Sequence, residues 1–267
     1  MKKPLSPEHK IYLKKLKKRS ALILISQIGF LALALSFWEL AARTGLTDPF
    51  ITSSPSRILA TFADLFKNGQ LWMHIGISTY ETVAGFLIGT ALGTAMAILM
   101  WWSDYIRRVF EPYLVVLNSL PKIALGPIII IWAGTGTASI IVMAVLISVV
   151  ITTISMLSGF CQTNPSKILL LKTMNANKLQ IFTKLIFPSN IPTLLSTLKI
   201  NVGMAWVGTI MGEYLVSKAG LGYLIVYGGQ IFKLDLVMTC TIALCVLAGG
   251  MYGLVALLEK TIVRWKS

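Results

Sequence analysis

The stretch GFLIGTALGTA, residues 85–95, places three glycines four positions apart in an otherwise apolar run. In a helix Gly85, Gly89 and Gly93 share one face, because residues i, i+4 and i+8 lie one above the other. A face of glycines lets a second helix backbone approach closely in lipid, where helix association depends on packing. The stretch therefore predicts a helix that packs tightly against a neighbour inside a membrane.

The composition of the whole chain also places it in a bilayer. Of its 267 residues, 55% are hydrophobic and 13% are charged, with a mean hydropathy of +0.76, whereas about 25% of residues are charged in soluble domains. The net charge of +14 would suit a nucleic acid. Membrane proteins, however, collect Lys and Arg in cytoplasmic loops for topological reasons. We therefore expect membrane lipid around the chain and no nucleic-acid partner.

Six apolar runs are long enough to cross about 30 Å of hydrocarbon as helices. The first contains Trp38 and Glu39 and is longer than the apolar region of a signal peptide, so we expect it to stay uncleaved. The third contains Pro112, Pro121 and Pro127 and should be broken. The runs cover residues 21–42, 79–102, 110–133, 138–160, 191–215 and 234–258. The expected fold class is an all-α polytopic membrane protein with six transmembrane helices.

The distribution of basic residues predicts the orientation in the membrane. With six spans both termini share one side, and 17 of the 24 Lys and Arg residues fall on that side: 8 in residues 1–20, 2 at positions 107–108, 4 in residues 161–190 and 3 in residues 259–267. The positive-inside rule makes that side cytoplasmic. We expect a basic cytoplasmic tail (1–20), a six-helix membrane domain (21–258) that contains the 161–190 loop, and a cytoplasmic C-terminal tail (259–267), in the plasma membrane.

The sequence lacks the motifs of an enzyme. It has no G-x-x-x-x-G-K-[ST] phosphate loop, no H-E-x-x-H and no G-x-S-x-G. Cys161, Cys240 and Cys245 lie on apolar runs without metal-ligand spacing, and His9 and His74 are far apart. We therefore expect no catalytic residue, no metal site and no cofactor, with any ATP bound by a different subunit.

Three acidic residues lie near or within the apolar runs, at Glu39, Glu81 and Glu213. A carboxylate in hydrocarbon is costly unless it is paired or faces water, so each is a candidate for function. For Glu39 and Glu81 the alternative is that they lie near the interface and reach lipid headgroups. Glu213, near the outer end of the fifth span, is expected to be paired or to face a cavity.

The segment SSPSRILATFADLFKNG, between the first two spans, predicts an amphipathic helix on the outer side. Ser56 is a candidate N-cap and Gly69 a stop. Its apolar residues recur at helical spacing: they are Ile58, Leu59, Phe62, Leu65 and Phe66. Such a helix either lies at the interface, covers the outer mouth of a pathway or packs on the other helices.

The loop of residues 161–190 contains LLLKTMNANKLQIFTKLIFPSNIP (residues 169–192 with the start of the next span), which has no His, Cys, Asp or Glu. A short helix should begin at Ser166, Asn175 can take the left-handed conformation that ends it, and Asn177 can cap the next helix. This pattern predicts a helix-turn-helix at the cytoplasmic face. An apolar stripe with a basic rim is typical of an element that docks into a cleft on a partner.

The same residues carry a family resemblance. KTMNANKLQIFTKLIFPSNIP resembles the cytoplasmic loop of permease subunits of ATP-binding-cassette importers, especially the nitrate, sulfonate and taurine group. Further stretches that resemble that group follow in order over most of the chain: WELAARTG, SSPSRILATF, GISTYETVAGFLIGTALGTAMA, LPKIALGPIIIIWAGTG and MGEYLVSKAGLGYLI.

In that family the loop begins Glu-Ala-Ala, with a Gly four residues after the second Ala, and it inserts as a coupling helix into the ATPase subunit. Here residues 169–171 are all leucine, Lys172 and Thr173 fit, and Asn175 replaces the Gly. Asn tolerates φ > 0 better than most residues. The missing acidic residue removes at most an exposed ion pair, worth about 0–1 kcal/mol. We expect a dedicated ATPase partner with a more apolar groove.

The resemblance implies a permease subunit that forms the translocation pathway, with three partners: an ATP-binding subunit, an extracytoplasmic substrate-binding protein and a second permease chain, giving a homodimer. The residues expected to dock the ATPase are Leu169, Leu170, Leu171, Lys172, Thr173, Met174, Asn175, Ala176, Asn177 and Phe182. The residues expected to line the pathway are Asn118, Lys122, Asn201, Trp206 and Glu213. The substrate stays open among nitrate, alkyl sulfonates, taurine and heteroaromatic vitamin precursors.

Other classes of protein predict different features. A secondary transporter driven by an ion gradient would show an internal inverted repeat and intramembrane carboxylates or unwound segments in both halves, and no such repeat is visible. A membrane enzyme would need a catalytic constellation. A purely structural scaffold would leave the 161–190 loop unexplained. The secondary transporter is the alternative to the importer permease.

Overall fold

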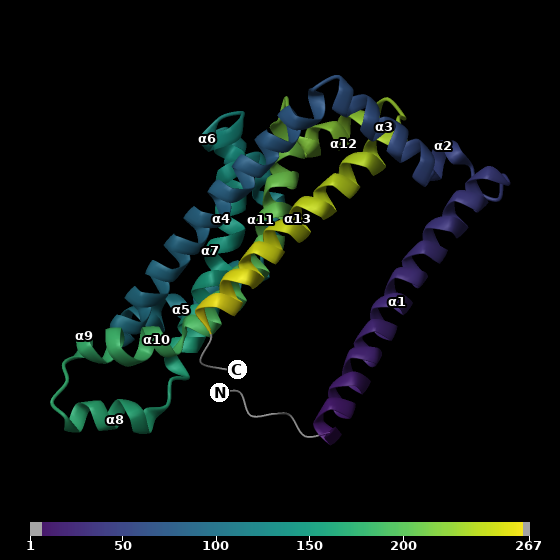
Figure 1. The fold of residues 1–267 in the computed structure, drawn as a ribbon. Coiled ribbons are helices and arrows are strands. Elements are labelled where there is room, and N and C mark those ends of the chain that lie inside the picture. Colours follow the sequence, from purple (N-terminus) through teal and green to yellow (C-terminus); the bar gives the residue numbers. More distant parts are fainter. Residues whose placement is uncertain (1–6, 264–267) are drawn as a thin grey trace.

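The computed structural model describes residues 7–263, and every regular element in that range is a helix (Figure 1). Five helices are long and apolar enough to cross a membrane, and a bent helix pair makes a sixth candidate. The five are α1 (Pro7–Arg43), α4 (Gln70–Trp102), α7 (Thr137–Cys161), α11 (Ile191–Val216) and α13 (Leu234–Ile262). The predicted all-α polytopic class is confirmed.

The third predicted span is the bent pair. It consists of α5 (Asp104–Ser119), followed after a break by the 3-10 turn η1 (Lys122–Leu125) and α6 (Gly126–Ala133), and the two parts are bent by 92°. The break falls at Leu120, which is extended at φ −66° and ψ 136°, a conformation favoured for the residue before a proline. Of the three prolines it is thus Pro121 that ends the helix, while Pro112 lies inside α5.

The shorter helices gather at the two ends of the bundle (Figure 1). At one end, here called the α3 end, lie α2 (Pro49–Thr52), α3 (Pro55–Lys67) and α12 (Leu221–Gln230). At the opposite end, the loop end, lies the α8–α10 segment, which consists of α8 (Pro165–Thr173), α9 (Lys178–Ile181), the π-helical turn η2 (Phe182–Ile186) and α10 (Phe187–Ser189). The start of α1 and the end of α13 also point to the loop end.

Several boundaries differ from the sequence prediction. Helix α1 already begins at Pro7, so most of the predicted basic tail continues the first span, and residues 1–6 lie outside the described range. Helix α3 is capped by Ser54 instead of Ser56: the Ser54 hydroxyl accepts from the amide of Arg57 at 3.4 Å, and Pro55 occupies the first helical position, which suits a proline. Helix α12 was not predicted at all.

The glycine face of α4 packs against α7, as its spacing predicts. A Cβ atom built on Gly85, Gly89 or Gly93 would lie 2.4–2.6 Å from the Cβ atoms of Ala144, Ser148 and Thr152 in turn. Such separations are too short for real side chains, so only glycine permits this approach. The residue numbers rise together along both helices, and α4 and α7 therefore run parallel.

Helix α11 packs on the same helix α7 in the opposite direction. A Cβ on Gly208 would lie 2.6 Å from the Cα of Ala144, and one on Gly212 would lie 3.0 Å from the Cα of Ile140. Helices α4, α7 and α11 therefore form the tightly packed centre of the chain. This centre fixes the relative positions of the groups at its two ends.

Candidate functional site

At the loop end, side-chain caps shape the α8–α10 segment. The Asn164 side chain accepts from the amide of Ser166 at 2.9 Å and starts α8. Asn175 ends it in the left-handed region, at φ 60°. Asn177 and Gln180 then form a reciprocal capping box, each side chain accepting from the other residue's amide at 2.8 and 2.9 Å. The roles predicted for Asn175 and Asn177 are thus present in the structure.

The outer face of this segment presents apolar side chains to its surroundings. Leu169, Leu170 and Met174 are 62%, 60% and 71% exposed. Leu171 and Ala176 instead pack against the core of the loop end. The remaining polar residues of the predicted docking set are exposed: Lys172, Thr173, Asn175 and Asn177. The arrangement offers a small apolar patch with a polar border.

Phe182 does not belong to that patch, and its expected role in direct docking is corrected. It is 8% exposed, and its ring lies 5.1 Å from that of Trp101 and 5.6 Å from that of Phe160. The turn of η2 directs it toward the ends of α4 and α7, where aromatic rings bury a large area. Phe182 therefore anchors the segment to the helical bundle.

At the α3 end, a cluster of hydrogen bonds surrounds Glu213, which is 1% exposed. Ser78 of α4 donates to one carboxylate oxygen at 2.5 Å, and the amide of Gly222 donates to the other at 2.5 Å. The amide of Leu221 in turn donates to the Ser78 hydroxyl at 2.8 Å. This Glu213 cluster ties the start of α12 to α4 and α11.

Two further residues complete the Glu213 cluster. His74, 5% exposed, accepts through Nδ1 from the amide of Gly220 at 2.9 Å. Gly220 has φ +118°, and a Cβ there would lie 2.4 Å from the Glu213 carboxyl carbon. Position 220 therefore requires glycine for two reasons: the positive φ angle, and the lack of space for a Cβ atom. The sequence expectation that Glu213 is paired is correct.

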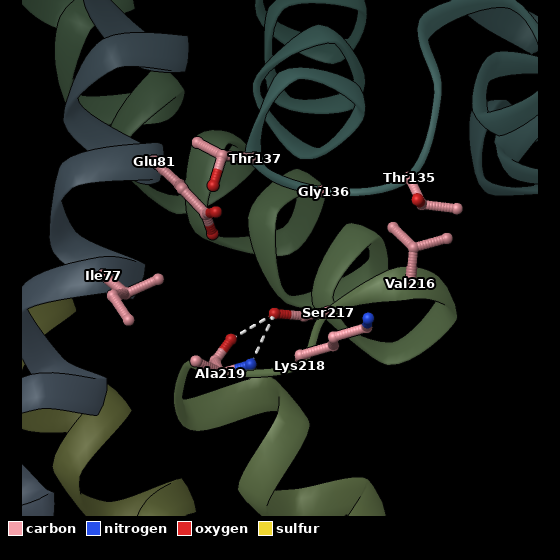
Figure 2. Close-up of a pocket in the computed structure, with 9 residues that line it drawn as sticks. All are labelled: Ile77, Glu81, Thr135, Gly136, Thr137, Val216, Ser217, Lys218 and Ala219. Atoms are coloured by element: carbon pink, nitrogen blue, oxygen red, sulfur yellow. Dashed lines mark hydrogen bonds between the residues drawn. The ribbon is translucent and has the colours of Figure 1, made fainter.

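A second buried carboxyl, that of Glu81, lies beside this cluster at the edge of a pocket. Glu81 is 1% exposed, and its neighbours in the interior are the side chains of Thr137 and Glu213. The pocket has a volume of about 310 Å³ and is bordered by α4, the α6–α7 connection and the α11–α12 connection (Figure 2). Its lining residues are Ile77, Glu81, Thr135, Gly136, Thr137, Val216, Ser217, Lys218 and Ala219. The alternative that Glu81 reaches lipid headgroups is therefore wrong.

Glu39 is held by contacts within the chain. Its carboxylate accepts from Arg43 at 2.7 Å, and from the amide and hydroxyl of Ser56 at 3.0 and 2.8 Å. It thus links α1 to the first turn of α3. Negative charge is favoured at a helix N-terminus, so the Glu39 carboxylate stabilises the start of α3.

The residues expected to line a pathway do not converge. Asn118 is exposed, and the ammonium group of Lys122 donates to the backbone carbonyl of Asn118 at 3.2 Å. Asn201 is fully buried and donates to Thr152 at 2.6 Å, while Trp206 is 6% exposed in the core. Asn201, Trp206 and Glu213 therefore lie inside the chain's own bundle in this conformation, because α11 uses these side chains to pack on α7, α4 and α12.

Sequence reasoning missed His74, Ser78, Gly220 and Gly222 at the α3 end. The two glycines stand in the short stretch AGLG, whose turn-forming character is visible in the sequence. Ser78 and His74 carry no such signal, because an isolated serine or histidine in an apolar helix has many ordinary explanations. Only the fold brings Ser78 and Gly222 to the Glu213 carboxylate and His74 to the amide of Gly220 beside it.

The fold and the two ends of its bundle define a polytopic helical membrane protein with a protruding, apolar-faced loop, a class that includes transport permeases. Residues 89–264 match the model of the family described as binding-protein-dependent transport system inner membrane component, and the chain belongs to that family. It is thus an importer permease subunit of the ATP-binding-cassette type, in a family whose members are not themselves enzymes, and a multi-pass protein of the plasma membrane.

Curated relatives align over most of their length. A probable ABC transporter permease protein of Haemophilus influenzae is 31% identical over 83% of this chain and 89% of its own. The formylaminopyrimidine transport permease protein ThiX of Halalkalibacterium halodurans is 32% identical over 77% and 81%. The taurine transport system permease protein TauC of Escherichia coli is 24% identical over 89% and 88%.

Solved structures share the fold. One chain of the inward-facing MetNI methionine ABC transporter superposes with a TM-score of 0.66 at 16% identity, covering 73% of this chain and 98% of its own. One chain of a bacterial ABC transporter involved in import of the acidic polysaccharide alginate gives 0.65 at 15% identity, covering 94% and 99%. At such identities the likeness concerns the fold alone.

Proposed function

We propose that the α8–α10 segment docks an ATP-binding subunit and that this chain couples ATP use on that partner to solute import. The single observation that carries the proposal is the exposed apolar patch of Leu169, Leu170 and Met174 on a capped, rigid segment. Exposed apolar side chains beside a polar border are typical of a partner surface. ATP itself binds to the partner, so this chain needs no cofactor.

The orientation of the chain follows from its charges and its shape. The loop end carries Lys167, Lys172 and Lys184 in addition to the two arginines of the first turn of α5. Basic residues collect on the cytoplasmic side, so the loop end faces the cytoplasm and the α3 end faces outward. An extracytoplasmic binding protein then delivers solute at the α3 end.

The transport cycle is a rigid-body change between two states. Two copies of the chain pair around the pathway, and each carries one docked ATPase subunit. ATP binding draws the ATPase subunits together and moves the α8–α10 segments, and the packed helices α4, α7 and α11 transmit this movement to the α3 end. The substrate is a small solute such as nitrate, a sulfonate, taurine or a vitamin precursor, and the names of three relatives support the last three of these classes.

Co-purification tests the docking proposal. The full chain is expressed with candidate ATPase subunits encoded beside its gene, as wild type and as Leu170→Asp and Met174→Asp. Both substitutions place a charge in the patch without touching the core, because the two side chains are 60% and 71% exposed. We expect a stoichiometric ATPase complex with the wild type and its loss, by at least about tenfold, in both variants.

A matched control keeps the result interpretable. Leu46 is 76% exposed in the connection between α1 and α2, outside the predicted spans, and Leu46→Asp places the same charge there. All variants are first checked by size-exclusion chromatography in detergent. A wild type that binds no ATPase, or a complex that survives both loop substitutions, would overturn the proposal and favour a carrier driven by an ion gradient.

A further inference from the structure

The pocket at the α3 end contains a buried acceptor without a partner. Glu81 is only 1% exposed, and its oxygen Oε2 is buried without a hydrogen-bond partner among the described residues. An unpaired buried carboxyl oxygen costs free energy. Glu213 already accepts one hydrogen bond on each of its oxygens, from Ser78 and from the Gly222 amide, and an ionised carboxyl group has no donor to offer Glu81.

The Glu81 side chain points from α4 toward the space between the α6–α7 and α11–α12 connections (Figure 2). A volume of about 310 Å³ is at the lower limit of small-ligand sites. The far side of the pocket is fixed locally, because the Ser217 hydroxyl donates to the carbonyl of Ala219 and accepts from its amide. The pocket is therefore a formed feature with one unsatisfied acid at its inner wall.

The other charged residue of the pocket is basic. Lys218 lies exposed on the wall that Ser217 and Ala219 form, and none of the ion pairs within residues 7–263 includes it. Thr135 and Ser217 add hydroxyls, and the remaining lining is partly aliphatic. An acid at the inner wall and a base on the far wall match a small molecule with opposite charges at its ends.

We propose that this Glu81 pocket binds a small zwitterionic solute at the outer mouth, with its ammonium group on Glu81 and its anionic group on Lys218. An ammonium supplies the donors that Glu81 lacks, and a simple inorganic anion supplies none. The assignment rests on the proposed function, because the pocket meets the transported solute only if solute enters at the α3 end. Within the substrate classes considered above, it selects amino-bearing solutes over plain anions.

Thiol labelling tests the charge of the pocket. Thr135→Cys, at an exposed position of the pocket lining, is introduced into the full chain in intact cells, and the unmodified chain reports the background from its native cysteines. Labelling rates are measured with a cationic trimethylammonium and an anionic sulfonate methanethiosulfonate reagent of equal size. We expect Glu81→Gln to lower the ratio of cationic to anionic rates about five- to tenfold, and Lys218→Met to raise it.

Protection by solutes tests the ligand class. The zwitterion 2-aminoethanesulfonate should slow labelling of Thr135→Cys, whereas ethanesulfonate, which lacks only the amino group, should not. Glu81→Gln should abolish the difference. Asp64→Asn is the matched control, because Asp64 is exposed on α3 at the same end and outside the pocket. Its labelling ratio and protection should equal those of the parent.

Two results would overturn the proposal: an unchanged labelling ratio in Glu81→Gln, or equal protection by both sulfonates. Neither readout requires an ATPase partner. If the ATPase does not co-purify but the amino-bearing sulfonate still protects selectively, the docking function is rejected and the site is kept. If the ATPase docks but protection is not selective, the site alone is rejected.

Discussion

Lys178, the first residue of α9, donates a hydrogen bond from its ammonium group to the backbone carbonyl of Trp102, the last residue of α4, at 2.5 Å. The ammonium nitrogen also lies 5.5 Å from the ring centroids of Trp101 and Trp102. A carbonyl at a helix C-terminus lacks an intrahelical partner, so a cation is favoured there. The α8–α10 segment is thereby joined to the helix that holds Ser78 and Glu81 at the other end.

The first prediction concerns this contact. Lys178→Met removes the donor and the cation, and because the site is exposed we expect a loss of about 1 kcal/mol. Hydrogen exchange of the α8 and α9 amides should accelerate about fivefold, while the apolar patch stays intact. Lys184→Met is the control, since Lys184 is exposed on the same segment and makes no ion pair or cation–π contact within residues 7–263. Equal exchange in the two variants would contradict the anchoring role.

The second prediction separates support from docking. Phe182→Ala should destabilise the loop end by about 3–5 kcal/mol, because it removes a buried ring from an aromatic cluster. Leu179→Ala, at a 57% exposed position on the same segment, should change thermal stability little. Thermal unfolding followed by intrinsic tryptophan fluorescence, to which Trp101 and Trp102 contribute with the other tryptophans, measures both. If Phe182→Ala melts like wild type, the ring does not anchor the segment.

The third prediction concerns the turn before α12. Gly220→Ala should disrupt the Glu213 cluster, because the new methyl group would collide with the Glu213 carboxyl and the residue holds φ +118°. We expect the free energy of unfolding to fall by about 1–3 kcal/mol. Proteolysis of the 217–222 connection should be faster. Gly229→Ala meets nothing within 4 Å and should be tolerated. Similar digestion of both variants would show that the turn is not constrained.

The fourth prediction addresses the packed centre. Gly93→Val would place a Cβ 2.6 Å from that of Thr152 and 2.7 Å from the carbonyl oxygen of Val149, so α4 and α7 must separate. Yield of monodisperse protein in detergent should fall strongly. Gly203→Val, on a face of α11 with nothing within 4 Å, is the control. A well-folded Gly93→Val protein would show that the glycine face is not required for packing.

The sequence by itself determined the membrane class, the positions of the long helices and the glycine face, because hydrophobic length and residue spacing act locally along the chain. It also determined the caps at Asn175 and Asn177, which depend on neighbouring residues alone. The family resemblance followed from stretches such as LPKIALGPIIIIWAGTG, in which Pro121 alone proved to end the helix.

Only the tertiary structure decided which polar groups meet. Phe182 and Leu170 belong to the same apolar pattern, yet one is buried and the other is exposed, because η2 turns Phe182 toward α4 and α7. Glu81 and Glu213 are 132 positions apart in the sequence, and no local pattern pairs one with Ser78 and leaves the other open to a pocket. Hydrogen bonds between distant segments depend on how the helices pack, which spacing along one helix does not specify.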